Sequence, residues 1–241
     1  MKPALQPRDA RDRLIVALDL KSVDAAQRAV GALGDAATFY KIGMQLVFAG
    51  GLAIADELHR AGKRVFLDMK LLDIDNTIEG AVASIAGLGV AFTTIHAYPN
   101  AMRAAVRARP ADGPGLLAVT VLTSLDDADL HQAGYAKSAA DLVSARAADA
   151  TNAGMQGIVC SPREIGAVRR IVGPEMVIVT PGIRPESAAA GDQKRTTGPR
   201  EAIAAGADYL VVGRPITEAA DPARAATRII AEIENAMGAR R

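Results

Sequence analysis

The sequence contains no tryptophan, one cysteine and only four residues each of phenylalanine and tyrosine. The single cysteine, Cys160, excludes an internal disulfide framework and fits a reducing compartment. The formal net charge is +1, whereas proteins that bind nucleic acid usually concentrate basic residues on one face. No apolar run reaches the roughly 18 residues needed to span a bilayer, and the first residues lack the apolar core of a signal peptide. We therefore expect a soluble cytoplasmic protein with no nucleic-acid or membrane partner.

Aliphatic residues dominate the composition. Half of the 241 residues are hydrophobic, mostly alanine, valine, leucine and isoleucine, which suits aliphatic strands packed against alanine-rich helices. Short apolar runs alternate with longer amphipathic stretches along the whole chain, a pattern typical of repeated βα units around a parallel sheet. The expected strands are residues 14–20, 38–42, 64–68, 92–96, 115–122, 157–160, 176–180 and 209–212. The expected helices are residues 23–33, 51–61, 77–87, 101–107, 138–153, 163–172, 199–205 and 221–237.

Eight alternating units predict a closed (β/α)8 barrel, the TIM-barrel architecture of the α/β class. Single barrels of this kind commonly run to about 250 residues, so residues 1–241 are expected to form one domain. No linker rich in proline, glycine or serine divides the chain. The connection at residues 182–198 is longer than the usual roughly 2 to 6 residues, which is typical of an active-site lid.

Polar residues follow most of the predicted strands, at the ends where barrels of this type carry their chemistry. They are Asp19, Lys41, Asp68 with Lys70, His96, Thr123, Arg184 and Arg214. Because the strands are parallel, we expect these side chains to converge on one mouth of the barrel.

The stretch Asp68-Met-Lys70-Leu-Leu-Asp73 sets a lysine between two carboxylates, after a run that predicts a buried strand. Residues two apart in an extended chain point to the same face, so Asp68 and Lys70 should project together. Neighbouring carboxylates raise a carboxyl pKa, and burial raises it further. Burying these charges together is therefore costly, and ordinary folding does not require such a cluster. With Lys41, the array suits a site where Asp68 lies beside a substrate anion and Lys70 protonates a developing carbanion. The alternative is an ion-pair network that closes the top of the barrel.

The loops after the seventh and eighth strands predict a phosphate site. Arg184 lies in the first loop, and Gly213 and Arg214 lie in the second. Exposed N–H groups at a helix start and a nearby guanidinium suit a phosphate dianion, and Gly213 allows close approach of the backbone. The alternative is a turn glycine beside a solvated arginine.

Other reactive residue types receive simpler interpretations. Cys160 has no obvious paired base and is interpreted as a small buried residue. The three histidines, at positions 59, 96 and 131, show no metal-ligand spacing, so no metal site is predicted. Only His96 is placed at the predicted mouth, whereas His131 is expected in a loop. The acidic run that begins at Asp126 predicts a solvated turn or a helix start.

The motif from Asp68 to Thr77, Asp-Met-Lys-Leu-Leu-Asp-Ile-Asp-Asn-Thr, resembles the signature of the orotidine 5'-phosphate decarboxylase family. Further matches follow in order between residues 17 and 216. They are Ala17-Leu-Asp19, Tyr40-Lys41-Ile-Gly, Val119-Thr-Val-Leu-Thr123-Ser, Thr180-Pro-Gly-Ile-Arg184-Pro, Gly191-Asp-Gln193 and Val212-Gly-Arg214-Pro-Ile. No single match is decisive, but the ordered set is specific.

The resemblance implies a (β/α)8 homodimer that converts orotidine 5'-monophosphate to uridine 5'-monophosphate and CO2, the last step of UMP synthesis, with no metal or organic cofactor. It implies that Asp19 and Lys41 contact the ribose hydroxyls, with Lys41 also holding Asp68. Asp68 would lie near the departing carboxylate, and Lys70 would protonate C6. The remaining implied contacts are Asp73, Ile74 and Thr77 in the neighbouring subunit's site, Thr123 at the pyrimidine, and Arg184, Gln193, Gly213 and Arg214 at the closing loop and phosphate.

The chain departs from the common family pattern at two positions, with Leu72 where many members have histidine and Asp75 where many have proline. Two other functions stay open. One is a metal-dependent sugar-phosphate decarboxylase or aldolase of the same superfamily, whose members carry a carboxylate near the position of Lys41. The other is a non-catalytic nucleotide-binding barrel that keeps only the phosphate site. A purely structural oligomer would leave the polar strand ends unexplained.

Overall fold

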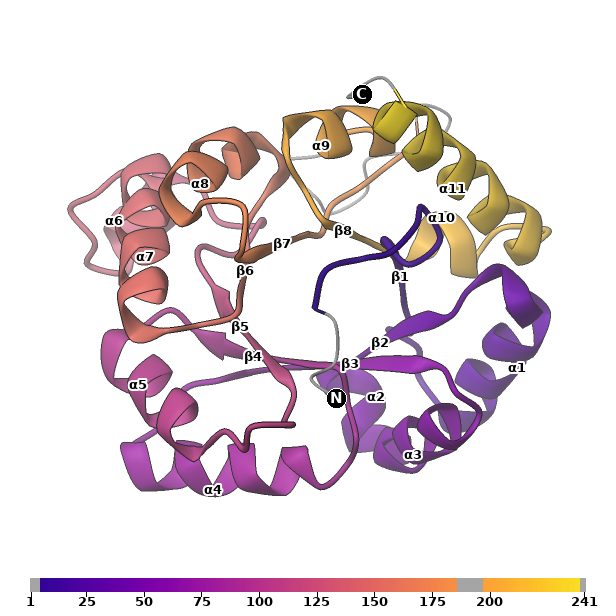
Figure 1. Ribbon diagram of the computed structural model, residues 1–241, viewed down its shortest axis with the longest axis horizontal. Helices are drawn as coiled ribbons and strands as arrows, with labels where there is room; N and C mark the ends of the chain where they lie inside the picture. Colours follow the sequence, from indigo (N-terminus) through magenta and orange to yellow (C-terminus); the bar gives the residue numbers. More distant parts are fainter. Residues whose placement is uncertain (1–4, 186–196, 239–241) are drawn as a thin grey trace.

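The computed structural model describes residues 5–185 and 197–238. Its strands are β1 (Leu14–Ala17), β2 (Phe39–Gly43), β3 (Arg64–Leu71), β4 (Phe92–His96), β5 (Gly115–Val119), β6 (Gly157–Val159), β7 (Val177–Thr180) and β8 (Tyr209–Val212). Each strand pairs in parallel with the next, and β1 pairs with β8, which closes the barrel (Figure 1). The predicted (β/α)8 barrel is therefore confirmed.

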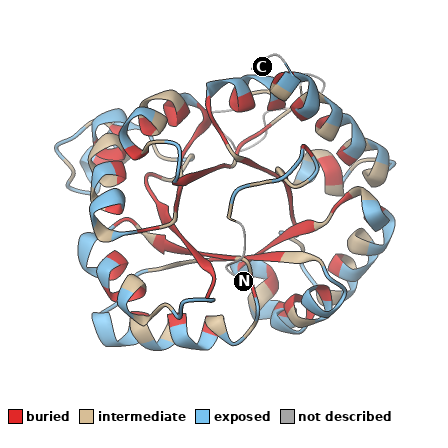
Figure 2. Cartoon of the chain, viewed as in Figure 1, coloured by how far each residue is buried: buried red, intermediate tan, exposed pale blue. Residues whose placement is uncertain are grey.

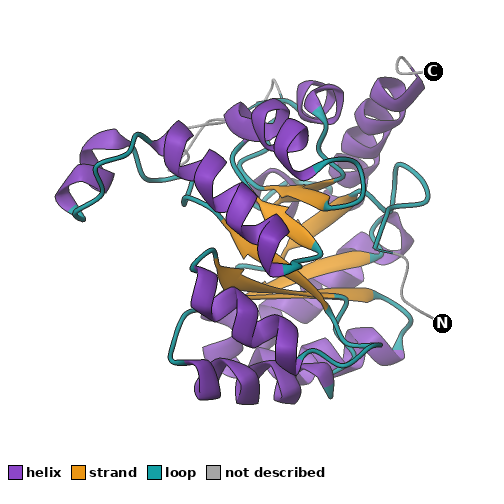
Figure 3. Cartoon of the chain, turned by 60° about the vertical axis from the view of Figure 1, so that its left-hand side comes forward, coloured by secondary structure: helices purple, strands orange, loops and turns teal. Residues whose placement is uncertain are grey.

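Helices follow the strands and surround them on the outside, as Figure 3 shows. They are α1 (Val23–Leu33), α2 (Met44–Leu46), α3 (Leu52–Arg60), α4 (Asp75–Ala86), α5 (Pro99–Ala108), α6 (Asp127–Gln132), α7 (Ala139–Ala153), α8 (Ile165–Val172), α9 (Pro199–Ala205), α10 (Arg214–Thr217) and α11 (Pro222–Gly238). Their buried residues face the strands and their polar residues face outward (Figure 2). In α4, for example, Ile78, Val82 and Ile85 recur at helical spacing and form the buried face.

The inside of the barrel is filled by its own layer of side chains, separate from the core beneath the helices. Four aromatic rings dominate this layer, and Phe39, Phe92 and Tyr209 meet with centroids 5.3 to 5.8 Å apart. The guanidinium of Arg64 lies 4.1 Å from the Phe39 ring centroid, a cation–π contact, and donates to the Tyr209 hydroxyl. Phe66 packs edge-on against Phe92. The barrel is thus a packed core with an aromatic layer across it.

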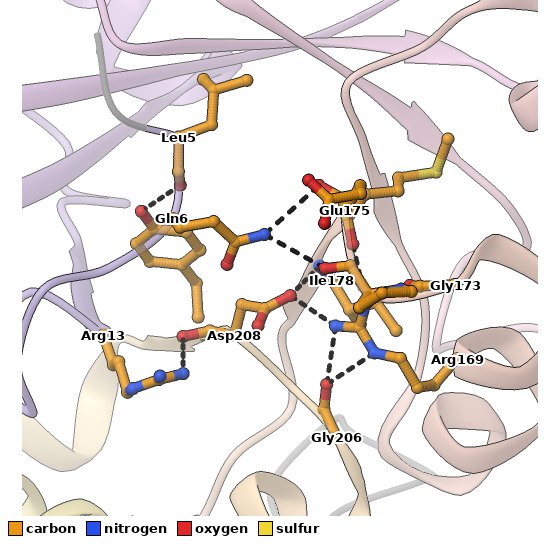
Figure 4. Close-up of polar contacts among 12 residues, drawn as sticks. Leu5, Gln6, Arg13, Arg169, Gly173, Glu175, Ile178, Gly206 and Asp208 are labelled. Atoms are coloured by element: carbon orange, nitrogen blue, oxygen red, sulfur yellow. Dashed lines mark hydrogen bonds and ion pairs between the residues drawn. The ribbon is translucent and has the colours of Figure 1, made fainter.

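Polar contacts tie the first described residues to the amino-terminal ends of β7 and β8, as Figure 4 shows. Gln6 donates to the carbonyl oxygens of Pro174 and Glu175, and the Tyr209 hydroxyl donates to Leu5. Beside them Arg169, from α8, forms an ion pair with Asp208. It also donates to the carbonyl oxygens of Gly173, Met176 and Gly206. Asp208 in turn accepts from the backbone N–H of Ile178 at 2.8 Å. This network secures the end of the barrel opposite to the predicted site.

Three strand ends differ by three residues from those predicted from the sequence. β1 ends at Ala17 and β5 at Val119, three residues earlier than expected in each case, although the apolar run continues. β3 continues to Leu71, three residues beyond the predicted end at Asp68, and the register against β4 shifts within this extension. The shift has a direct consequence for Lys70, described below.

Several short helical segments lie outside the helices that were expected from the sequence. α2 and a π-helical turn, Val47–Gly51, fill the connection between β2 and α3. α10 is a single turn that begins at Arg214. α6 begins after Asp126, whose side chain and that of Asp129 form a reciprocal cap, so the acidic run is a helix start. The prediction that His131 lies in a loop is wrong, because His131 belongs to this helix.

Within the described residues, no helix has both the length and the apolar character that crossing a membrane requires.

Candidate active site at the carboxyl ends of the strands

Strand alternation places the charged residues directly above the apolar interior of the barrel. Phe39 and Phe66 belong to the interior layer, and Lys41 and Asp68 follow each of them by two residues. β2 and β3 are neighbours in register, so their inward-facing positions lie side by side. Asp19 follows the interior residue Ala17 in the same way, just beyond the end of β1. The sequence pattern therefore carries each side chain to the same mouth.

Lys41 and Lys70 share one carboxylate oxygen. Lys41 Nζ lies 2.8 Å from Asp19 Oδ1 and 3.3 Å from Asp68 Oδ2. Lys70 Nζ lies 2.7 Å from the same Asp68 Oδ2. The four groups form a continuous array of alternating charge, Asp19–Lys41–Asp68–Lys70, and the array extends from half-exposed Asp19 to buried Lys41 and Asp68.

The array fixes the charge states of its two buried members. Burial alone would lower the pKa of Lys41, but the carboxylates of Asp68 and Asp19 outweigh burial and raise it. Burial alone would raise the pKa of Asp68, but the ammonium groups of Lys41 and Lys70, with hydrogen bonds from Lys70 and Thr94, hold it below its usual range. Asp68 is therefore ionised and Lys41 protonated at neutral pH.

Lys70 lies in a local distortion of β3. Its φ angle is +49°, and it is the one non-glycine residue with positive φ among those described. Leu67 pairs with Thr93 and Leu71 pairs with Ile95, so β3 advances four residues while β4 advances two. Left-handed backbone costs a side-chain-bearing residue about 1–2 kcal/mol, and such conformations cluster at functional sites. Asp68 and Lys70 do meet as predicted, but through this bulge and not through regular strand alternation.

Gly43, at the end of β2, has no side chain, and the charge array occupies the space where a side chain would lie. A Cβ atom at this position would lie 2.7 Å from Asp19 Oδ1 and 3.1 Å from Lys41 Nζ. Any larger residue would therefore displace the Asp19 carboxylate or the Lys41 ammonium. The sequence reasoning did not single out Gly43, although its place two residues after Lys41 on the same face was a usable signal.

The array opens into a cavity of about 490 Å³, a size typical of small-molecule sites. The predicted site residues that line it are Asp19, Lys41, Asp68, Lys70, Thr123, Arg184, Gly213 and Arg214. Its floor is apolar and includes Phe66 and Val211 from the interior layer. The charge array therefore lines one side of the cavity, and the two arginines predicted to bind phosphate line the other.

The arginine side of the cavity is built by the segments after β7 and β8. Ile183 and Thr197 form an isolated bridge, and the backbone N–H of Arg184 donates to the Thr197 carbonyl at 3.0 Å. These contacts join the two described ends of the connection predicted as a lid. Gly213 precedes α10, whose first residue is Arg214. Two guanidinium groups and a helix start thus border the cavity, as a phosphate would need.

Comparison with known proteins identifies the family. The orotidine 5'-phosphate decarboxylase / HUMPS family profile matches residues 12–229. The chain belongs to this family. An orotidine 5'-phosphate decarboxylase of Rhodopseudomonas palustris (strain HaA2) is 60% identical over 226 residues, which cover 94% of this chain and 96% of that protein. One of Methylorubrum extorquens (strain PA1) is 61% identical over 230 residues, covering 95% of this chain and 98% of its own.

A solved structure supports the same family and fold. The orotidine 5'-phosphate decarboxylase from Lactobacillus acidophilus has a TM-score of 0.81 and 34% sequence identity, and the match covers 95% of this chain and 99% of that one.

Three residues assigned by family resemblance lie outside the cavity. Asp73 and Ile74, on the connection from β3 into α4, and Thr77, in the first turn of α4, are exposed and do not line the cavity of their own chain. Gln193 lies outside the described residues. The two family departures lie nearby: Leu72, on this connection, is 50% exposed, and the carboxylate of Asp75, the first residue of α4, pairs with Arg107 at 3.0 Å. Asp75 thus forms an ion pair with a residue of α5.

Cys160 fits the simpler interpretation given to it, whereas His96, expected at the mouth, is not among the residues that line the cavity. His96 ends β4 and is half-buried; burial first, then Arg146 and Lys70, lower its pKa, so its imidazole is neutral at pH 7. Cys160 borders the cavity but is buried, and burial, with Glu164, raises the pKa of its thiol. A protonated buried thiol is a poor nucleophile. Among the residues described, no three histidine, cysteine or acidic side chains are grouped as a metal site requires.

Thr94 is the contact that the sequence reasoning missed. This buried β4 residue donates from Oγ1 to Asp68 Oδ1 at 2.9 Å and accepts from the Lys70 N–H, also at 2.9 Å. It lies two residues after Phe92, so alternation along β4 places both on the interior face of the barrel.

Proposed function

We propose that this chain decarboxylates orotidine 5'-monophosphate to uridine 5'-monophosphate and CO2, in the last step of UMP synthesis, without a metal or organic cofactor. The observation that carries the proposal is the pair of Lys70 and Asp68, with Nζ 2.7 Å from Oδ2 at the edge of a nucleotide-sized cavity. Family membership and relatives of about 60% identity that bear this name supply the substrate.

The reaction breaks the bond between C6 and the carboxylate carbon, and the electron pair stays on C6. The ammonium of Lys70 stabilises this developing charge more in the transition state than in the ground state, which is the condition for acceleration. Lys70 then gives its proton to C6, becomes a neutral amine and regains a proton from solvent. Asp68, held ionised by the two lysines, places negative charge beside the carboxylate that departs.

The remaining cavity residues are assigned to three parts of the substrate, the ribose, the pyrimidine and the phosphate. Asp19 and Lys41 are assigned to the ribose hydroxyls by the family resemblance; half-exposed Asp19 is in contact with buried Lys41 at 2.8 Å. Thr123 is assigned to the pyrimidine end. Arg184, Gly213 and Arg214 are assigned to the phosphate, together with Gln193. Binding energy from a phosphate remote from C6 can be used in the transition state, so a substrate without phosphate should lose turnover as well as affinity.

The position of Lys41 argues against a metal-dependent sugar-phosphate enzyme of the same superfamily. Its ammonium lies 2.8 and 3.3 Å from the two carboxylates that a divalent cation would otherwise use. A cation placed there would face a buried positive charge whose pKa is raised.

The test is the near-ultraviolet absorbance change when purified protein is added to orotidine 5'-monophosphate. We expect turnover that survives chelation, and we expect Lys70→Ala to lower the rate by about 10²- to 10⁴-fold. Lys63→Ala is the matched control, because Lys63 immediately precedes β3, at the end remote from Lys70, and pairs with exposed Asp35. Binding of uridine 5'-monophosphate without turnover would favour the non-catalytic barrel, and loss of activity on chelation would favour the metal-dependent enzyme.

We also propose that two copies of the chain form a homodimer in the cytoplasm, each a single catalytic domain over residues 1–241, with shared active sites. Large apolar side chains are exposed on the segments that follow the neighbouring strands β2 and β3. They are Met44 (47% exposed), Phe48 (83%), Leu52 (42%), Leu72 (50%) and Ile74 (71%). A soluble monomer gains nothing from such a surface, whereas an interface would bury it. Asp73 lies within it, which suits a role in the partner's cavity.

The shared-site proposal predicts complementation. Lys70→Ala and Asp73→Ala should each be weakly active alone, but a mixture allowed to exchange subunits should recover activity. One site of each mixed dimer then contains both intact residues. No recovery after demonstrated exchange would assign Asp73 to its own chain's site.

A further inference from the structure

The Lys70 side chain depends on a backbone conformation that its own residue type disfavours. Its φ angle of +49° lies in the region that glycine adopts readily. The extra residues of β3 around it also interrupt the regular ladder with β4 between Leu67 and Leu71. Contacts from elsewhere must therefore hold this conformation, and the described contacts of Lys70 identify Thr94.

The Thr94 hydroxyl uses both of its hydrogen-bonding functions in this region. The Lys70 N–H can only donate, and it reaches Thr94 Oγ1 at 2.9 Å in place of a ladder bond. Asp68 is ionised and can only accept, so the Thr94 proton points to Asp68 Oδ1, at 2.9 Å. The direction of both bonds is fixed by the chemistry of the partners.

These hydrogen bonds form a closed ring of contacts among Lys70, Thr94 and Asp68. Its backbone is held by Thr94, Thr94 holds Asp68, and the other Asp68 oxygen holds the Lys70 ammonium at 2.7 Å. One buried hydroxyl thereby couples the left-handed backbone to the direction in which the ammonium points. Thr94 itself is fully buried and does not line the cavity, so it acts only through its two neighbours.

We propose that Thr94 is a positioning residue that aims the Lys70 ammonium at the reacting carbon. The inference rests on the proposed decarboxylase function for its kinetic readout. Without the hydroxyl, Lys70 returns toward extended backbone and Asp68 loses one of its donors. Turnover then falls while substrate affinity stays, because the residues assigned to ribose and phosphate belong to other strand ends.

The adjacent Thr93 provides a matched control. It is also fully buried in β4, but its hydroxyl has no hydrogen-bond partner among the described residues. Alternation turns it away from the interior face that Phe92 and Thr94 share. Thr93→Val and Thr94→Val remove the same atom from the same strand and create no cavity. Only the second breaks the ring.

The experiment compares kcat and KM for Thr94→Val, Thr94→Ser and Thr93→Val. We expect Thr94→Val to lower kcat by about 100-fold with KM changed by less than about threefold, because a displaced catalytic group costs rate more than binding. Thr94→Ser keeps the hydroxyl and should stay within about fivefold of wild-type kcat. Thr93→Val should stay within about twofold. A normal kcat in Thr94→Val, or an equal loss in all three variants, overturns the inference.

A second measurement does not depend on the reaction. A crystal structure of Thr94→Val should show Lys70 out of the left-handed region, and amide exchange at Lys70 should be faster than in Thr93→Val. If wild-type protein fails to decarboxylate the substrate, the proposed function fails, but this readout still decides the role of Thr94. An unchanged Lys70 conformation and unchanged exchange in Thr94→Val refute that role even if the enzyme is active.

Discussion

Lys41 and Asp68 face each other across neighbouring strands, with Nζ 3.3 Å from Oδ2 and both side chains only 10% exposed. Each keeps its charge because the other is present: the pKa of Lys41 is raised and that of Asp68 is lowered despite burial. Breaking such a pair leaves a buried charge without its partner, which is more costly than losing an exposed ion pair.

Lys41→Met should therefore destabilise the fold by about 3 kcal/mol at pH 7. The variant leaves Asp68 buried beside Asp19 with Lys70 as its remaining cation, so the pKa of Asp68 should rise. Urea unfolding at several pH values measures both effects, and the deficit should shrink as the pH falls and Asp68 takes up a proton. Lys63→Met removes an ion pair to an exposed carboxylate and should cost less than about 1 kcal/mol. Equal stability losses in the two variants would contradict the prediction.

The stability that Asp68 contributes should depend on pH in a defined direction. Its pKa in the fold is below the ordinary 3.8, so the unfolded chain binds this proton more readily. The contribution is complete above pH 3.8 and is lost as the pH falls through the lower, folded value. The difference in unfolding free energy between wild type and Asp68→Asn should be constant from about pH 5 to 7 and shrink below about pH 4. A difference that changes near neutral pH would refute this assignment.

Gly43→Ala should impair the site with little effect on the fold. The added methyl would lie 2.7 Å from Asp19 Oδ1, and half-exposed Asp19 can move away only by loosening its contact with Lys41. We expect an increase in KM of about tenfold, as for loss of one charge-assisted contact to the ribose. Gly31→Ala, in α1 with open space around its Cβ position, is the matched control and should stabilise by about 0.5–1 kcal/mol. Unchanged kinetics in Gly43→Ala would show that Asp19 moves freely.

Arg169→Met should affect stability and leave catalysis intact. The guanidinium holds three backbone carbonyls and Asp208 at the end of the barrel remote from the cavity, where it is 22% exposed. Its loss leaves Asp208 without its cation, so we expect a cost of about 3 kcal/mol. Thermal unfolding measures the loss, and kcat below the transition should equal that of wild type. Arg170→Met, on the exposed side of the same helix, should change neither quantity.

The sequence predicted the barrel well because its evidence is local. Apolar runs of strand length alternating with amphipathic segments require only neighbouring residues to be recognised, and all eight strands were found. Asp19, Lys41 and Asp68 were located because each follows an apolar run at the end where parallel strands converge. The end of β1 was missed because Leu18 continues the apolar run, although it lies beyond the last residue of the strand.

What the sequence could not provide depends on contacts between distant residues. The bulge at Lys70 rests on Thr94, 24 residues further along the chain. Thr93 and Thr94 are identical neighbours, and only the pairing of β3 with β4 decides which hydroxyl meets Asp68. The position of Asp73 outside its own cavity is equally invisible in a motif that places it five residues after Asp68.

The aromatic layer in the barrel has a consequence for the order of events. Phe66 belongs both to that layer and to the floor of the cavity, so the described side chains close the barrel directly beneath the charge array. Under the proposed chemistry, a gas molecule formed beside Asp68 has no passage downward through these rings. It departs on the side by which the nucleotide arrived. Substrate entry and product release then use the same opening of the cavity. The larger product, the nucleotide held by its phosphate, determines when this opening is free for the next substrate.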